Sequence, residues 1–411
     1  MKRPLVWWLS TPLYAYRKSL LRIRPVQKKL VYLYMRRLLK RQSNRTAPKP
    51  EGAPERILWV NLNHIGDVLM DLPAVYALHR QYPQAEIDLL AKSFVRPILE
   101  QVPFIQRIYT YKAPFVFGGD DLSANFPAMV SLFRKLRAAN YDLAAEITGR
   151  DRNRIACFWS GAKKRVGIKG DPLVLDSPMF AYINCEALMT DVIEVPNRLR
   201  HESENAIDVL RGAGLLPADA PVEPLRLEAS AEHKQEVQET LEQLGVTRPL
   251  VVMHAFSQDP RRLWRPERWA AVADYLTGHG FDVLLIGSRG DAPYNQSIAA
   301  FAKEHILDGT GRFPLSSLLA LFERTTLAVT IDSGPGHVAA LVETPAISLF
   351  LPCLSSIHHP YRQEHRVVNA SEVFTLTEYF DSPVSPRLDS ISVAMVLRAI
   401  DSVLPGASRI A

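Results

Sequence analysis

The sequence predicts an α/β protein built on two doubly wound parallel sheets, each at the centre of its own domain. Three observations predict this fold class. The chain has 411 residues, enough for two domains of ordinary size. Apolar runs of strand length alternate with stretches of helical periodicity, in two blocks separated by the proline-rich stretch 217–224. Several of these runs end in glycine and polar residues, as strands do where a parallel sheet binds a ligand.

The first block, at about 56–216, begins with an apolar strand at 57–63. Further strands are expected at 86–91, 106–111 and 141–147, with helices at 68–82 (interrupted near Pro73), 94–101, 122–138 and 152–160. The first strand ends at His64-Ile65-Gly66-Asp67. Asp67 is either the N-cap of the next helix or a carboxylate available as a general base, and His64 is either structural or catalytic.

Basic residues gather after the fourth strand of this block. They could receive an anionic substrate or form a solvated charged face, and both interpretations remain open. The set, at a strand end and the loop expected after the next helix, comprises Arg150, Arg152, Arg154, Lys163, Lys164 and Arg165.

The second block, at about 249–352, has the more regular alternation. An outer helix at 231–244 precedes it, and a tail with an irregular stretch at 360–386 and an amphipathic helix at 390–403 follows. Strands are expected at 250–256, 281–287, 305–308, 327–332 and 346–351, and helices at 266–279, 292–303, 314–324 and 335–342.

A glycine-rich corner follows the apolar run 327–331. It reads Asp332-Ser333-Gly334-Pro335-Gly336, and His337 then opens a helix. Glycines let backbone N–H groups approach a ligand, and the N–H groups at a helix start favour anions, so the corner suits a diphosphate. The alternative is a tight turn in which Asp332 or Ser333 caps the helix.

Other strand ends of the second block meet the same edge. Their arginine, hydroxyl and glycine groups suit a nucleotide diphosphate, and Asp291 could bind ribose hydroxyls. The sequence has no Walker loop and no G-x-G-x-x-G after its first strand, which disfavours ATP hydrolysis and dinucleotide redox chemistry. These residues are Ser257, Arg261, Arg262, Gly287, Asp291, Thr310 and Gly311.

The N-terminal segment differs from the rest of the chain in charge. Residues 1–50 contain 14 Lys and Arg and no Asp or Glu, which leaves 35 basic and 43 acidic residues in 51–411. Basic pairs alternate with aromatic residues such as Trp7-Trp8, so we expect residues 1–45 to bind an anionic membrane surface. A solvated helix packed on the body is the alternative. Nucleic acid is not expected as a partner, because the body is acidic.

Cysteine usage and hydropathy bound the compartment. The three cysteines, Cys157, Cys185 and Cys353, are scattered and lack metal-ligand spacing, which favours a reducing compartment and no metal site. No apolar run approaches the roughly eighteen residues that a membrane-spanning helix needs.

From Ile57 to Pro352 the sequence resembles glycosyltransferase family nine, the ADP-heptose:lipopolysaccharide heptosyltransferases. The resemblance rests on ordered motifs, among them the Gly66-Asp67 ending, Arg262-Leu-Trp-Arg-Pro-Glu-Arg-Trp269, Gly309-Thr-Gly311 and Asp332-Ser-Gly-Pro-Gly-His337. It implies a GT-B fold, in which two Rossmann-like domains face a cleft. Two motifs depart from the family pattern: Asn61, Asn63 and His64 replace Arg-x-Ser-Ser, and His254-Ala-Phe-Ser257 replaces Pro-Gly-Ala-Ser.

The resemblance also implies roles for individual residues. Asp67 matches the catalytic base of an inverting transfer, Asp332 to His337 match the donor-diphosphate loop, and Arg262 takes the place of a lysine that stabilises the leaving phosphate. Asp291 falls near the acidic residue that contacts ribose. No metal or cofactor is implied, since the nucleotide sugar, expected to be ADP-linked, is a substrate. The acceptor set expected in the first domain is His64, Gly66, Arg150, Arg152 and Lys163.

Together these expectations describe an inverting glycosyltransferase that transfers heptose from ADP-heptose to a lipopolysaccharide-core or other anionic lipid-linked glycan. It would act in the cytoplasm, peripherally bound to the cytoplasmic face of the inner membrane. The alternative is a non-catalytic membrane scaffold that keeps the nucleotide-sugar fold. The expected domains are an arm at 1–54, an acceptor domain at 55–225, a nucleotide-sugar domain at 226–370, and a tail at 371–411 with a terminal helix.

Overall fold

The computed structural model describes residues 52–110, 122–170, 185–219, 221–371 and 388–404. The basic arm expected to bind a membrane therefore lies outside the described residues, apart from the last three residues of 1–54. Among the residues that the structure does describe, no helix is both long and apolar enough to cross a membrane.

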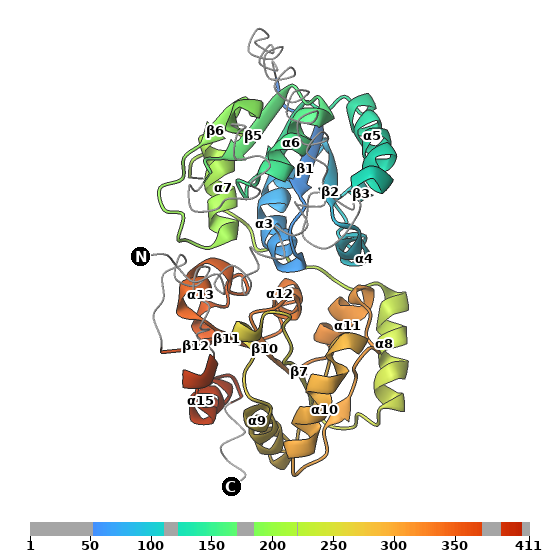
Figure 1. Ribbon diagram of the computed structural model, residues 1–411, viewed down its shortest axis with the longest axis vertical. Helices are drawn as coiled ribbons and strands as arrows, with labels where there is room; N and C mark the ends of the chain where they lie inside the picture. The colour runs from blue at the N-terminus through green and yellow to red at the C-terminus, as the bar shows by residue number, and fades with distance from the viewer. Residues whose placement is uncertain (1–51, 111–121, 171–184, 220, 372–387, 405–411) are drawn as a thin grey trace, which may run out of the picture. The chain divides into compact units, whose positions relative to one another are not determined.

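The chain divides into two compact units (Figure 1). Among the described residues, the first unit holds those from 52 to His64, Asp71–Arg198 and Ser203–Glu223. The second holds Ile65–Met70, Leu199–Glu202 and the described residues from Pro224 to Leu404. The first turn of the long helix α3 (Ile65–Gln81) therefore belongs, by its contacts, to the second unit.

The first unit contains a six-stranded parallel sheet with the order β3-β2-β1-β4-β5-β6. Its strands are β1 (Arg56–Asn61), β2 (Glu86–Ala91), β3 (Arg107–Thr110), β4 (Leu143–Glu146), β5 (Lys164–Ile168) and β6 (Asp191–Ile193). Its helices are α3 (Ile65–Gln81), α4 (Arg96–Leu99), α5 (Leu122–Ala138), α6 (Asp151–Ser160) and α7 (Glu202–Gly212).

The second unit repeats the design, with the strand order β12-β11-β10-β7-β8-β9. Its strands are β7 (Leu250–His254), β8 (Asp282–Leu285), β9 (Leu307–Asp308), β10 (Leu327–Ile331), β11 (Ala346–Phe350) and β12 (Val367–Asn369). Its helices are α8 (Ala231–Gln243), α9 (Pro266–Gly278), α10 (Ala292–Phe301), α11 (Leu318–Glu323), α12 (Gly334–Leu341), α13 (Pro352–His358) and α15 (Val393–Val403).

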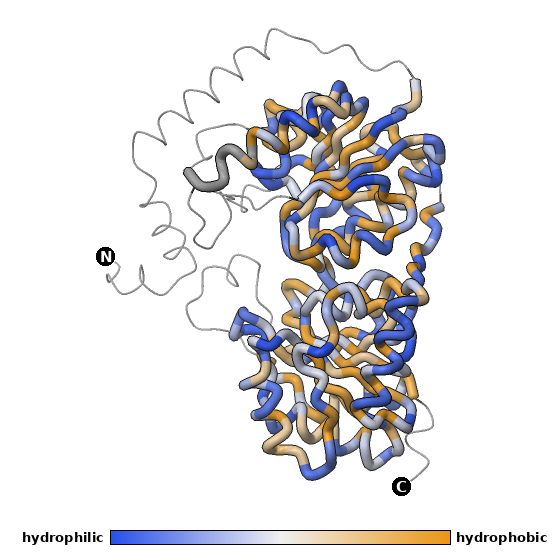
Figure 2. Tube along the Cα trace, turned by 90° about the vertical axis from the view of Figure 1, so that its right-hand side faces the viewer, coloured by the Kyte–Doolittle hydropathy of each residue, from blue (hydrophilic) through white to orange (hydrophobic). Residues whose placement is uncertain are grey.

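Each sheet is buried on both of its faces, as parallel sheets are when helices cover them. Every residue of β4, β10 and β11 is buried. In Figure 2 the apolar stretches of the chain run through the interior of each unit. The structure therefore confirms the expected α/β class with two parallel sheets. Continuous rather than alternating apolar runs in the sequence had indicated strands that are buried on both faces.

The C-terminal helix α15 packs on α9 within the second unit. The Tyr275 hydroxyl donates to Asp401 at 2.6 Å, and the Trp264 indole N–H donates to the carbonyl of Ile391 at 2.9 Å. Arg268 donates to the carbonyls of Asp389 and Ile391 at 2.6 and 2.7 Å. The tail thus backs the segment that connects β7 to α9.

Two expectations about local structure were wrong. Pro73 does not interrupt α3, which runs from Ile65 to Gln81 with the proline inside it. Burial of neighbours such as Leu69 and Leu72 offsets the hydrogen bond that proline cannot donate. Because the helix begins at Ile65, Asp67 lies within its first turn and is not its N-cap.

Candidate functional site

The order of the second sheet reverses between β7 and β10, which lie side by side with Thr330 opposite His254. In doubly wound sheets ligands bind beyond the carboxyl ends of the strands at such a reversal. The chain leaves β10 at Asp332 and leaves β7 at His254. The predicted diphosphate corner is therefore at the position where this fold class binds ligands.

Asp332 and Arg262 form the charged part of this corner. Nη1 of Arg262 lies 3.0 Å from Oδ2 of Asp332, which is 7% exposed. Burial raises the pKa of Asp332, and the charge of Arg262 opposes that rise. Arg262 ends a short 3-10 turn, Pro260–Arg262, whose N-cap Asp259 accepts from the Arg261 N–H. A guanidinium held in this way places a positive charge at the corner that the sequence predicted to bind a diphosphate.

Glycines let the corner pack closely against its surroundings. A Cβ on Gly336 would come within 2.9 Å of Oγ1 of Thr330, and the hydroxyls of Thr330 and Ser348 lie 3.1 Å apart beneath it. A Cβ on Gly334 would come within 2.5 Å of Cγ2 of Ile65. These contacts place the start of α12 directly against the buried hydroxyls of Thr330 and Ser348 and against the half-buried Ile65.

The first turn of α3 lies against the start of α12, within the second unit. A Cβ on Gly66 would be 3.0 Å from Nε2 of His337. Asp67 follows in the same turn and is half-buried, and its negative charge raises the pKa values of both Asp332 and His337. For His337 burial dominates and lowers the pKa to about 4. The structure thus brings Gly66 and Asp67 together with the predicted diphosphate corner.

The remaining residues predicted to bind the donor form hydrogen bonds with neighbouring loop residues or with α10. Asp291 forms a capping box with Ser288, accepting from its N–H at 2.7 Å and its hydroxyl at 2.9 Å. A Cβ on Gly287 would meet that carboxylate at 2.7 Å. Gly311 has φ of 73° and donates to the carbonyl of Gly287 at 2.8 Å. The ribose contact of Asp291 therefore stays a prediction.

The others also have local partners. Arg261 binds the carboxylate of Asp259 through Nη2 at 2.7 Å. The hydroxyl of Ser257 accepts from the N–H of Asp259 at 3.1 Å. The hydroxyl of Thr310 accepts from Nδ2 of Asn295 at 2.9 Å.

In the first unit the sheet reverses between β1 and β4, and polar side chains join the two loops there. Oδ1 of Asn153 accepts from the N–H of Leu62 at 3.1 Å, and Arg152 donates to Oδ1 of Asn63. Nδ2 of Asn61 donates to the buried Asp71 at 2.8 Å. The asparagines that depart from the family motif thus hold the β1–α3 turn in place.

Two more of the expected acceptor residues, Arg150 and His64, lie near this reversal. Arg150 is the residue before α6 in an extended conformation, and His64 is exposed just before α3.

The expected cluster of six basic residues does not form. Arg150 and Arg152 lie at the carboxyl ends of the strands, whereas Lys163 lies at their amino ends. Its Nζ binds Asp142, just before β4, at 2.7 Å. Lys164 and Arg165 belong to β5 rather than to a loop. Arg165 is buried and donates to the carbonyls of Leu188 and Ala162, both at 2.7 Å. An aliphatic stem allows a strand to bury such a residue when backbone acceptors satisfy its guanidinium.

A buried ion pair that the sequence analysis missed lies at the end of β4. Nε of Arg154 is 3.3 Å from Oε1 of Glu146, and Nη2 is 3.5 Å from Oε1 of Glu186. Burial raises the pKa of Glu146 to about 7, against the lowering effect of Arg154. The signal was a lone glutamate inside the apolar run 141–147. Arg154 is thus a core residue and not part of an acceptor surface.

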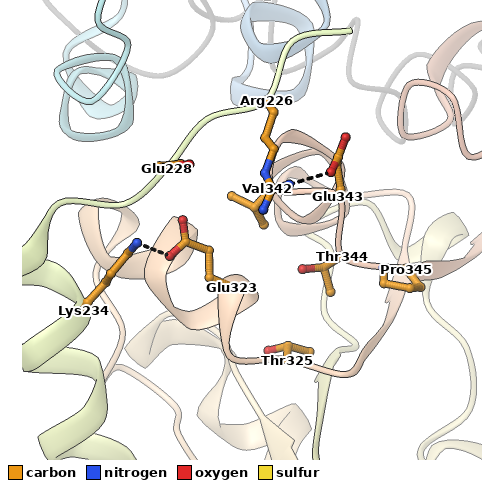
Figure 3. Close-up of a pocket in the computed structure, with 9 residues that line it drawn as sticks. All are labelled: Arg226, Glu228, Lys234, Glu323, Thr325, Val342, Glu343, Thr344 and Pro345. Carbon is orange, nitrogen blue, oxygen red and sulfur yellow. Dashed lines mark hydrogen bonds and ion pairs between the residues drawn. The ribbon is translucent and has the colours of Figure 1, made fainter.

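Figure 3 shows a polar pocket at the amino-terminal edge of the second sheet, where Thr325 precedes β10 and Pro345 precedes β11. Two ion pairs lie along it, Arg226 with Glu343 and Lys234 with Glu323, each at 3.0 Å. The pocket contains none of the predicted site residues. It lies where the chain enters the second unit, since the N–H of Ala229 donates to Glu323 at 2.8 Å.

Within the part of the chain that the structure describes, no group of three or more His, Cys, Asp and Glu is placed to hold a metal ion.

Comparison with known families then identifies the chain. The family model for glycosyltransferase family 9 (heptosyltransferase) matches residues 129–376. The chain belongs to this family.

Relatives and solved structures of family 9 resemble nearly the whole chain. Lipopolysaccharide heptosyltransferase 3 of Escherichia coli is 26% identical over 353 residues, which cover 84% of this chain and 97% of that protein. The family 9 glycosyltransferase of Veillonella parvula has a TM-score of 0.73 at 22% identity, covering 87% of this chain and 99% of the other. The ADP-heptose lipopolysaccharide heptosyltransferase II of Escherichia coli has a TM-score of 0.65 at 22% identity, covering 86% and 99%.

These likenesses confirm the resemblance drawn from the motifs, and the two solved structures confirm the fold. The protein is accordingly a glycosyltransferase of the heptosyltransferase family.

Proposed function

We propose that this protein transfers heptose from ADP-heptose to a lipopolysaccharide-core acceptor, with inversion at the anomeric carbon and Asp67 as the general base. The observation that carries the proposal is the packing of the first turn of α3 against the start of α12. It brings a half-buried carboxylate and a glycine-rich helix start into one region. The names of the relatives, lipopolysaccharide heptosyltransferases among them, supply the donor and acceptor class.

In the proposed reaction an acceptor hydroxyl attacks the anomeric carbon of the heptose. Its proton passes to the carboxylate of Asp67, and the bond from the anomeric carbon to the diphosphate oxygen breaks. The electron pair of that bond leaves with ADP. Arg262 and the backbone N–H groups at the start of α12 stabilise the negative charge that develops on the diphosphate.

The acceptor is proposed to lie beside the β1–β4 reversal of the first unit. Arg150 precedes α6 there and Arg152 lies in its first turn, and a guanidinium pairs well with a phosphate or carboxylate of an anionic sugar. His64 and Gly66 border the same turn. Lys163 is left out of this set because it lies at the amino-terminal ends of the strands, where it binds Asp142.

The test uses purified full-length enzyme, ADP-heptose and lipopolysaccharide from a strain whose core lacks heptose, with released ADP and modified lipid both measured. Asp67→Asn should lower kcat by about 100- to 10,000-fold, because a positioned base contributes on that order, and should leave ADP affinity nearly unchanged. Glu100→Gln, at an exposed site in α4's ion pair, is the matched control. Retained turnover in Asp67→Asn would falsify the assignment of the base.

A screen of ADP-, GDP- and UDP-linked sugars by calorimetry tests the donor separately. The proposal expects binding of the ADP-linked donor and transfer from it. ADP-heptose that binds without transfer to any lipid acceptor would instead favour the non-catalytic scaffold.

A further inference from the structure

We propose that His254 is a positioning residue of the donor site, which turns the side chain of Ser333 away from the start of α12 and so keeps the backbone N–H groups there available to the donor diphosphate. This inference rests on the proposed function, since it assumes that α12 binds the diphosphate. It concerns His254-Ala-Phe-Ser257, one of the motifs in which the sequence departs from the pattern of the family it resembles.

A short chain of hydrogen bonds joins the two strands at the reversal. Nδ1 of His254 lies 3.0 Å from Oγ of Ser333, and that hydroxyl donates to the carbonyl of Ile331 at 3.1 Å. Serine has a single hydroxyl proton. We assign that proton to the bond with Ile331, and the imidazole of His254 then donates from Nδ1 to the serine oxygen.

The position of Ser333 explains why this matters. It is the N-cap residue of α12, with φ of −159° and ψ of 161°, yet its side chain makes no capping hydrogen bond. Serine is among the most favoured N-cap residues because its hydroxyl accepts from the N–H of the second or third helical residue. The second residue here is Pro335, which has no N–H, so a capping hydroxyl would bind the N–H of Gly336.

A capping hydroxyl and a diphosphate would compete for the same donor. The N–H of Gly336 makes one long bond, 3.2 Å, to the carbonyl of Ser333. Held by His254, the serine hydroxyl faces β7 and β10, so the first turn of α12 presents its N–H groups without a side-chain cap. Burial lowers the pKa of His254 to about 4, which keeps the imidazole neutral and adds no charge to the corner.

The inference makes a specific claim about two substitutions that a purely structural role would not. Without the imidazole, Ser333 is free to rotate and cap the helix, and the donor must displace it. We therefore expect His254→Ala to weaken ADP binding about fivefold when residue 333 is serine, the factor that corresponds to one serine cap. In the Ser333→Ala background the same histidine substitution should change ADP affinity by less than about twofold.

The experiment is a double-mutant cycle measured by calorimetry with ADP on the full-length chain, comparing His254→Ala with and without Ser333→Ala. His254→Asn is the conservative variant, because its amide nitrogen can replace Nδ1, and it should restore affinity to near that of the unaltered enzyme. Equal losses in both backgrounds would overturn the proposal. So would a His254→Asn enzyme as weak as His254→Ala.

A second measurement is independent of ligand binding. In protein with ¹⁵N-labelled histidine, the His254 signal, assigned by its loss in His254→Asn, should report the Nδ1–H tautomer at neutral pH. The Nε2–H tautomer would overturn the hydrogen-bond chain. An unaltered enzyme that binds ADP but transfers no sugar would refute the proposed function and leave this inference standing, and one that binds no ADP would refute both.

Discussion

Arg262 and Asp332 form an ion pair in which Nη1 of the arginine lies 3.0 Å from Oδ2 of a carboxylate that is almost fully buried. The pair joins the loop after β7 to the loop after β10, across the reversal of the second sheet. Burial and the nearby carboxylates of Asp67 and Asp259 raise the pKa of Asp332, and the charge of the arginine is the largest effect that favours its ionised form.

We expect Arg262→Ala to lower kcat/KM for ADP-heptose by roughly 100-fold, because it removes a cation proposed to stabilise the leaving diphosphate and leaves a buried carboxylate without its partner. Arg262→Lys should recover part of this loss, since lysine keeps the charge but not the planar fork. Steady-state kinetics measure both. Arg265→Ala is the control, because Arg265 pairs with Asp389 at an exposed site. Equal effects at 262 and 265 would contradict the assigned role.

Glu146 should make part of the stability depend on pH. Burial raises its pKa from 4.5 to about 7 in the folded chain. Between these values the folded state holds a proton that the unfolded state has released, so the free energy of unfolding falls as pH rises through this window. The loss over the window is on the order of 3 kcal/mol.

Urea denaturation at several pH values between 4.5 and 7.5 checks this prediction. The Glu146→Gln variant cannot titrate at this position, so its stability relative to the unaltered protein should increase with pH. A difference that is constant across the window would show that Glu146 does not titrate there.

Buried histidines should have the opposite effect on the free energy of unfolding, which should fall as the pH decreases. Burial lowers the pKa of His201 to about 3, and those of His254 and His337 to about 4, from an ordinary value of 6.5. Below pH 6.5 the unfolded chain gains protons that the folded chain excludes, so stability falls as pH falls toward 4. Each histidine contributes a slope of about 1.4 kcal/mol per pH unit within its window.

His201→Gln isolates one of these contributions. Nε2 of His201 lies 2.7 Å from the carbonyl of His359, and the glutamine amide can donate in its place. Denaturation between pH 6.5 and 4.5 should give a shallower slope for His201→Gln than for the unaltered protein. The control is His305→Gln at an exposed position. A slope unchanged by His201→Gln would argue against the prediction.

The basic arm gives a prediction about membranes. Full-length protein should sediment with vesicles that contain anionic lipid, less so at high salt, because each Lys or Arg near such a surface contributes about 1 kcal/mol. Replacing Lys28, Lys29, Arg36 and Arg37 by glutamine should abolish most of this binding. Vesicles of neutral lipid are the control. Undiminished sedimentation of the substituted protein would show that these four residues do not carry the membrane binding.

The sequence predicted most of the architecture because apolar runs marked the strands. The bounds of β2 and α5 match the expected 86–91 and 122–138. All five strands expected in the second block are present, with ends that differ by a few residues. Buried parallel strands are continuous in hydrophobicity, which is the strongest local signal that a sequence contains.

Helix α7 was missed although its eleven residues are enough for a helical period, but the other missed elements lacked such a signal. Strand β5 begins with Lys164 and Arg165, so its charge indicated a loop, and the carbonyls that satisfy Arg165 are visible only in the fold. Strand β6 has three residues and α13 has seven, too few for a period to emerge. The site was predictable where motifs ended strands, as at Asp332. The bond from His254 to Ser333 was not, because it joins residues 79 positions apart.

The attachment of the C-terminal helix has a consequence for the enzyme as a whole. Trp264 and Arg268, whose bonds end on residues 389 and 391, follow Arg262 by only a few positions. Residues 388–404, the last stretch that the structure describes, therefore support the segment that carries the arginine proposed to receive the departing diphosphate. Shortening the protein from its far end would loosen that arginine without removing any group that contacts the donor.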